Sequence, residues 1–138
     1  LGGEYDCRFD HVVFNPPFLE EGSYLGSPDE SRAPAMGEME GALQFKDWIA
    51  IANRVLKPKA MLTFIHRADY LQNIMKHMDH RFGQIEIIPI YSKENEPAKR
   101  IIIRAKKGSR SPSILHPGVF LYDIAISNAI LREGHSIL

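Results

Sequence analysis

The sequence lacks several features that would assign a chain to a class directly. It has one cysteine, Cys7, which excludes an internal disulfide framework and fits a reducing cytoplasm. Lysine plus arginine and aspartate plus glutamate number 17 each, so the net charge does not indicate a nucleic-acid partner. No apolar run approaches the ~20 residues that a membrane-spanning helix needs.

The composition is that of an ordinary globular protein. The 138 residues are 44% hydrophobic and 25% charged, and their number suggests one domain with a modest core. The first residues, 1–6, read as a linker that leads into a strand. Because the chain opens at Leu1 and not at a methionine, we expect further sequence before it.

An apolar run at 9–14 that ends in Asn15-Pro16-Pro17-Phe18 organises the rest of the sequence. The run has the length and the Val/Phe content of a buried strand. The prolines cannot continue a strand, because they have no N–H donor and fix φ near about −65°. Asn15 precedes a proline and therefore favours an extended backbone. This predicts a polar amide at the carboxyl end of a buried strand, where open α/β sheets bind ligands.

Helical and strand patterns alternate downstream. The predicted elements are a helix at 42–56, a strand at 60–66, a helix at 69–82, and strands at 84–91 and 101–105. Gly83 is the expected stop of the second helix, and Pro89 indicates an edge strand. The last strands are joined by about seven residues without a helix, which predicts an antiparallel hairpin.

The long segment 19–41 has neither a helical nor a strand period. A connection of this length is usually functional or mobile, and its position after the Asn-Pro-Pro-Phe turn predicts a lid over a substrate. A surface loop without a role is the alternative. In the helix that follows, Trp48 is expected in the core rather than as a base-stacking platform. The tail beyond residue 108 has no chemistry that its residues assign.

Asn15-Pro16-Pro17-Phe18 after a hydrophobic strand resembles the substrate-amine motif of class I S-adenosylmethionine-dependent methyltransferases that act on exocyclic or amide nitrogens. Further stretches resemble the bacterial family that methylates the N6 amine of adenine in valine tRNA. These are Pro-Ala-Lys-Arg-Ile-Ile-Ile at 97–103, Lys-Lys-Gly at 106–108 and His-Arg-Ala at 66–68. The resemblance covers nearly the whole chain, but only the carboxyl half of such an enzyme.

The resemblance implies the fold. It is an α/β fold, the C-terminal half of a class I (Rossmann-like) methyltransferase sheet, with parallel strands and a final antiparallel hairpin. Residues 1–138 would form a single partial domain on the substrate side, and the cofactor-binding N-terminal half would be missing. No Gly-rich turn after a first strand is found, so we expect the chain alone to bind S-adenosylmethionine poorly and to be inactive.

The resemblance also implies the site and its cofactor, S-adenosylmethionine. The Asn15 side-chain oxygen and the Pro16 carbonyl would accept the amine N–H groups, Pro17 would stiffen the corner and Phe18 would stack on the base. Asn15 is also expected at the cofactor. Methyl transfer from a sulfonium to nitrogen needs no metal, and none is expected.

Basic residues near the same sheet edge are the candidate RNA contacts: Arg32, Arg67, Lys99 and Arg100. A second basic group, Lys106, Lys107 and Arg110, would lie at the opposite end of the hairpin. That group either neutralises RNA phosphates or is a solvated strand end, and the sequence leaves both open.

The resulting hypothesis is an N-methyltransferase of an exocyclic adenine amine in tRNA, acting in the cytoplasm. Guanine-N2 of ribosomal RNA and a protein glutamine are alternative substrates, because each offers an N–H₂ group of similar geometry. A non-catalytic RNA-binding or interaction module is a further alternative. The strand 9–14 would form an open sheet edge, so we also expect a homodimer that pairs there.

Overall fold

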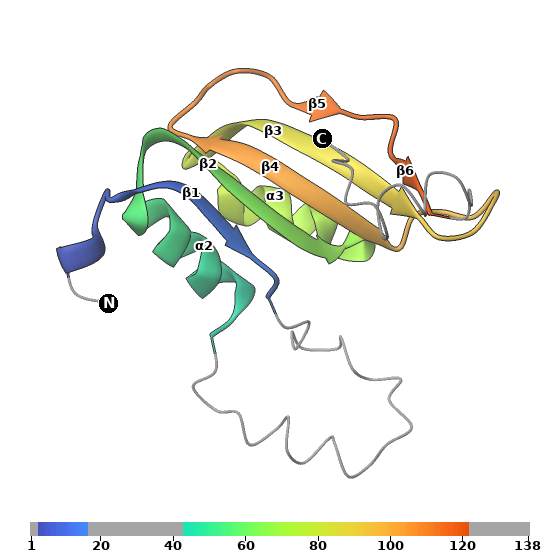
Figure 1. Cartoon of the computed structure of the whole chain (residues 1–138), viewed down its shortest axis with the longest axis horizontal. Helices are drawn as coiled ribbons and strands as arrows, with labels where there is room; N and C mark the ends of the chain where they lie inside the picture. Colours follow the sequence, from blue (N-terminus) through green and yellow to red (C-terminus); the bar gives the residue numbers. More distant parts are fainter. Residues whose placement is uncertain (1–2, 17–42, 122–138) are drawn as a thin grey trace, which may run out of the picture.

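The computed structural model describes residues 3–16 and 43–121 (Figure 1). Short 3-10 helices cover Gly3–Tyr5 (η1) and Ala68–Tyr70 (η2). The α-helices are α2 (Phe45–Val55) and α3 (Leu71–Met78). The strands are β1 (Phe9–Phe14), β2 (Leu56–Arg67), β3 (Phe82–Tyr91), β4 (Arg100–Lys107), β5 (Ile114–Leu115) and β6 (Val119–Phe120).

The described strands form one sheet in the order β1-β2-β4-β3-β5, and β6 also pairs with β3. β1 and β2 are parallel, whereas β4 lies between β2 and β3 and is antiparallel to both. β1, β2 and β3 therefore run in the same direction, and their arrowheads point to the same side in Figure 1. The expected α/β fold, with parallel strands and a closing antiparallel hairpin, is confirmed.

Helix α2 begins later than its apolar pattern predicts. The Asp47 carboxylate accepts a hydrogen bond of 2.8 Å from the Gln44 N–H, which satisfies a donor that the first turn leaves unpaired. Leu43, which lies within the predicted helix 42–56, precedes the observed helix and is 47% exposed. None of the described helices is long and apolar enough to cross a lipid bilayer.

Helix α3 ends earlier than expected, and Gly83 is not its stop. The helix ends at Met78, and His80 takes the left-handed backbone conformation with φ 66°. Gly83 lies in β3, where a Cβ atom would be 2.0 Å from the carbonyl oxygen of Ser109. The glycine is thus needed for the close approach of another backbone segment, which no local pattern indicates.

The prediction that Pro89 marks an edge strand is wrong. Pro89 is paired with Ile101 of β4, and β5 and β6 line the other side of β3. The carbonyls of Ile87 and Tyr91 accept hydrogen bonds from the 114–121 segment, so the Pro89 nitrogen faces the same side. It falls in the gap between β5 and β6, where no donor is needed.

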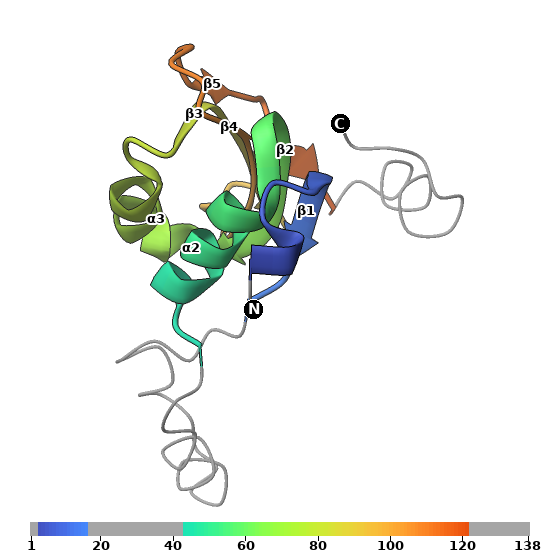
Figure 2. The same cartoon turned by 90° about the vertical axis from the view of Figure 1, so that its left-hand side faces the viewer.

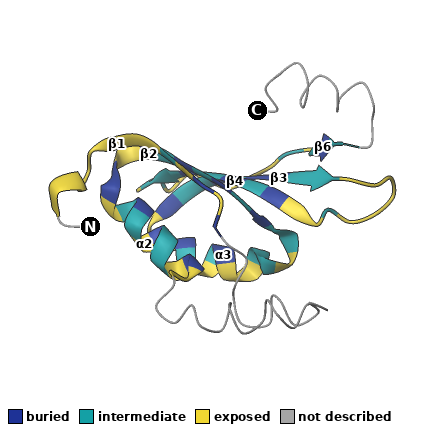
Figure 3. Ribbon diagram, turned by 60° about the horizontal axis from the view of Figure 1, so that its bottom comes forward, coloured by how far each residue is buried: buried dark blue, intermediate teal, exposed yellow. Residues whose placement is uncertain are grey.

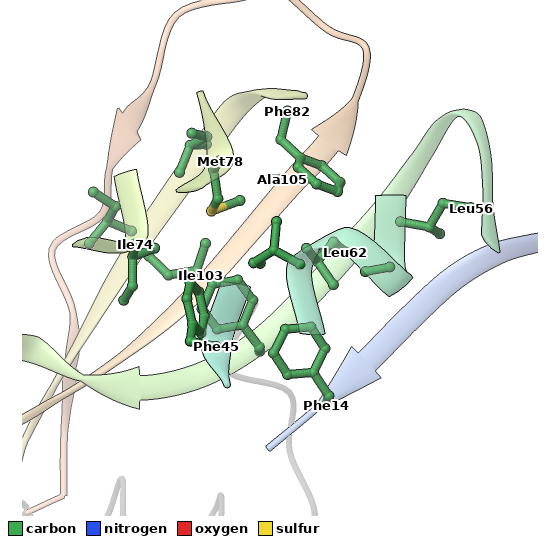
Figure 4. Close-up of a cluster of buried hydrophobic side chains, with 14 of the residues drawn as sticks. Phe14, Phe45, Leu56, Leu62, Ile74, Met78, Phe82, Ile103 and Ala105 are labelled. Carbon is green, nitrogen blue, oxygen red and sulfur yellow. The ribbon is translucent and has the colours of Figure 1, made fainter. Parts of the chain in front are cut away.

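The hydrophobic core lies between one face of the sheet and the helices α2 and α3 (Figures 2 and 3). β2 alternates along its second half, with Leu62, Phe64 and His66 buried on the helix side. Its other face is only partly buried, so within the described residues helices cover one face rather than both. Figure 4 shows the core members Phe14, Phe45, Leu56, Leu62, Ile74, Met78, Phe82, Ile103 and Ala105.

The close approach at Gly83 generates a stability prediction. Gly83→Ala should lower the free energy of unfolding by about 1–3 kcal/mol, because the Ser109 backbone must move away from the new methyl group. Gly3→Ala is the control, since its Cβ would meet only Asp6 Oδ2, at 3.5 Å. Urea unfolding followed by circular dichroism measures both variants. Equal unfolding midpoints for the two would contradict the structural role of Gly83.

Candidate active site

Asn15 follows β1 directly and is exposed, whereas its neighbours Phe14 and Pro16 are buried. The Phe14 ring stacks on Phe64 of β2, with centroids 4.9 Å apart and an interplanar angle of 2°. It also lies 5.4 Å from the ring of Trp48, which packs against the core as expected. Buried residues on both sides therefore fix the backbone of Asn15 and leave this residue open to solvent.

This corner lies at the carboxyl ends of strands that run in the same direction. Phe14 is level with Phe64 in the parallel pair of β1 and β2. Asn15 is therefore one strand away from the last residues of β2, His66 and Arg67. The arrangement matches the edge where open α/β sheets bind ligands.

The candidate RNA contacts of the hairpin reach the same edge. Arg100 is paired with Arg67 across β2 and β4, and the Ala68 N–H donates a hydrogen bond of 3.0 Å to the Lys99 carbonyl. The Arg100 Nη1 group donates to the same carbonyl at 3.2 Å. Arg67, Lys99 and Arg100 are thus brought together, although they are about 30 residues apart in the sequence.

The three side chains differ in exposure. Arg67 forms an ion pair with Asp69, and its side chain is 29% exposed, so part of its charge is already offset. Lys99 and Arg100 are exposed.

An aromatic group that sequence reasoning missed surrounds His66. His66 is 2% exposed, its ring stacks on Tyr70 at 4.7 Å, and Phe45 meets it edge-on at 5.1 Å. Its Nδ1 accepts a hydrogen bond of 2.8 Å from the Arg67 N–H, so the neutral ring carries its proton on Nε2. The packing of His66 therefore stabilises the end of β2, next to the candidate RNA contact Arg67.

Part of the predicted site lies outside the described residues. Pro17, Phe18 and Arg32 fall in the range 17–42, as does the predicted lid. Their proposed roles remain predictions from the sequence.

The second basic group, Lys106, Lys107 and Arg110, lies at the opposite end of the strands from Asn15. Lys107 is paired with the first residue of β3, and its Nζ donates a hydrogen bond of 2.6 Å to the Leu56 carbonyl. Arg110 lines a cavity of about 750 Å³ beside Phe82 and Gly83. Lys107 thus has a role inside the fold, and this cavity is separate from the edge that holds Asn15.

The described residues do not provide a complete cofactor site. In ranges 3–16 and 43–121 no Gly-rich turn leads from a strand into a helix, and η2 connects β2 to α3 without a glycine. The described residues thus lack the turn that such folds use to hold the phosphate or sugar part of a cofactor.

Two curated relatives, from a Shewanella species and from Shewanella putrefaciens, are both named tRNA1(Val) (adenine(37)-N6)-methyltransferase. Each is 27% identical over 100 residues, which is 72% of this chain and 40% of the relative. The chain is related to methyltransferases. This agrees with the resemblance carried by the Asn-Pro-Pro-Phe turn and the hairpin. No protein-family model matches the chain.

A solved structure gives the same relationship at the level of the fold. The crystal structure of a predicted O-methyltransferase from Agrobacterium tumefaciens matches 85% of this chain, with a TM-score of 0.63 and 26% identity. The match covers 45% of that protein. The chain therefore spans less than half the length of the curated relatives and of this methyltransferase structure.

Proposed function

We propose that the chain is the substrate side of an N-methyltransferase that acts on an exocyclic adenine amine in tRNA. The observation that carries the proposal is the exposed Asn15, held between buried Phe14 and Pro16 at the carboxyl edge of the sheet. Arg67, Lys99 and Arg100 at the same edge support an RNA substrate. The names of the Shewanella relatives support adenine in tRNA.

The chemistry follows from what these groups can accept and hold. The lone pair of an adenine amine is delocalised into the ring, which makes the nitrogen a poor nucleophile. The Asn15 side-chain oxygen and the Pro16 carbonyl would each accept one N–H of the amine, which orients the nitrogen and localises its lone pair. S-adenosylmethionine, when bound, supplies the methyl group. In this scheme Phe18 would stack on the base, which must be outside a duplex stack.

The chain matches only part of the length of these methyltransferases, which supports the view that substrate and cofactor are bound by different segments. We propose that residues 1–138 form the substrate-side part of one methyltransferase domain and that cofactor-binding residues lie mainly outside them. The chain alone is then expected to be inactive. A tRNA substrate would place the complete protein in the cytoplasm.

Two further substrates share the required N–H₂ geometry, namely guanine-N2 of ribosomal RNA and a glutamine of a protein. A non-catalytic RNA-binding module is the alternative that is not an enzyme. A methyl-transfer assay distinguishes these alternatives. An enzyme labels only its own substrate, and a non-catalytic RNA-binding module labels none.

The unpaired long side of the outer strand β1, which is not the carboxyl edge described above, suggests a further contact. β1 is the outer strand on its side of the described sheet. An apolar groove of about 500 Å³ runs between this strand and α2, with Val13, Ile51 and Val55 in its lining. Val13 is 70% exposed. We propose that this edge, Phe9–Phe14, pairs with a second copy of the chain.

The activity test uses the complete gene product, a tritiated methyl donor and three substrates: valine tRNA transcript, ribosomal RNA and a release factor. We expect label in the tRNA. Asn15→Ala should lower kcat by about 10²–10³-fold, as the loss of one positioned hydrogen-bonding group does in other enzymes. Asn73→Ala, which removes an exposed carboxamide from α3, should have no effect.

Label in ribosomal RNA or release factor, but not in tRNA, would reassign the substrate. Normal transfer by the Asn15→Ala protein would contradict the role of the carboxamide, whichever substrate is used.

The edge contact is tested by light scattering on this chain. The expected mass is twice that of one copy, and Val13→Lys should reduce it to the single mass, because a charge at an open edge blocks strand pairing. A single-copy mass for the unchanged chain would exclude the dimer.

A further inference from the structure

An aromatic pair lies at the carboxyl end of β3, on the same sheet edge as Asn15. Tyr91 is the last residue of β3 and is paired with Phe120 of β6. Their rings are stacked, with centroids 5.2 Å apart and an interplanar angle of 10°. Figure 1 shows β6 beside the end of β3, on the side toward which β1 and β2 also point.

The pair is not part of the main hydrophobic core. Neither Tyr91 nor Phe120 belongs to the buried cluster between the sheet and its helices, and both are partly exposed. Rings that are held in place but partly open to solvent are suited to stack on a planar ligand.

Several contacts hold the segment that carries Phe120. The Leu121 N–H donates a hydrogen bond of 2.8 Å to the Tyr91 carbonyl. Gly118, with φ 104°, leaves room for the tyrosine, since a Cβ there would lie 2.8 Å from Tyr91 Cε2. Upstream, the His116 ring nitrogen lies 2.9 Å from a carboxylate oxygen of Glu86, whose side chain is 12% exposed. The aromatic pair is thus ordered before any ligand binds.

The neighbouring charges are compatible with RNA without being strongly basic. Arg100, which follows Lys99 in the chain, is paired with Ile90, the residue before Tyr91. The hairpin turn between β3 and β4 also carries Glu94 and Glu96. Because the charges are mixed, base stacking rather than phosphate attraction would supply most of the affinity here.

We propose that Tyr91 and Phe120 form a stacking surface for a base of single-stranded RNA, next to the nucleotide presented at Asn15. The inference rests on the proposed function and adds residues to its substrate site. Three strand spacings separate β1 from β3 across β2 and β4. At about 4.8 Å each, this is roughly 14 Å. The surface therefore serves a neighbouring nucleotide and not the methylated one.

The test measures binding of a fluorescein-labelled single-stranded RNA dodecamer to this chain by fluorescence anisotropy. Tyr91→Leu and Phe120→Leu should each raise Kd by about fivefold or more, because an aromatic face is lost while apolar volume is kept. Tyr5→Leu is the matched control. Tyr5 also stacks on a phenylalanine, Phe9, at 6.3 Å, but it lies at the amino end of β1. Its substitution should leave Kd within about twofold.

Urea unfolding confirms that each variant is folded before its Kd is compared. Equal effects of all three substitutions, or no effect of any, would overturn the proposal, as would the absence of RNA binding by the unchanged chain. In the complete gene product, Tyr91→Leu should raise the KM for tRNA and leave kcat unchanged. RNA binding that depends on the pair, without methyl transfer by the unchanged protein, would refute the proposed function alone.

Discussion

The stacking of Phe14 on Phe64 is the contact on which the rest of the arrangement depends. It joins the ends of β1 and β2 in the core, at 4.9 Å between centroids, and thereby fixes where β1 stops. Pro16 is also buried, so Asn15, between Phe14 and Pro16, points away from the interior. The exposure of Asn15 thus follows from the two buried hydrophobic residues, Phe14 and Pro16, on either side of it.

The same edge collects residues from distant parts of the chain. Parallel β1 and β2 deliver Asn15 and His66, and the returning strand β4 delivers Arg100. The insertion of β4 between β2 and β3 moves Tyr91 one strand further out, where β6 joins it. The strand order thus separates Asn15, the proposed position for the amine, from Tyr91, the proposed position for a second base.

Sequence alone predicted the elements whose signals are local. The apolar run ending in prolines predicted the bounds of β1, and a short polar connection predicted the hairpin. The expected burial of β1 was wrong, because the strand is the outer one on its side of the described sheet and only Phe14 in it is buried. Features that depend on remote partners were missed. Gly83 was read as a helix stop because its actual neighbour, Ser109, is far away in the sequence. The ring contacts of Phe45 and Tyr70 with His66 likewise follow from packing, not from any spacing.

The central claim is that the Asn15 carboxamide is available to an amine at this edge. Nuclear magnetic resonance of the ¹⁵N-labelled chain during titration with adenosine or inosine tests it directly, because inosine has no exocyclic amine. We expect adenosine to shift the Asn15 side-chain signals and inosine to leave them unchanged. Equal shifts with both nucleosides, or shifts confined to residues at the opposite edge such as Arg110, would contradict it.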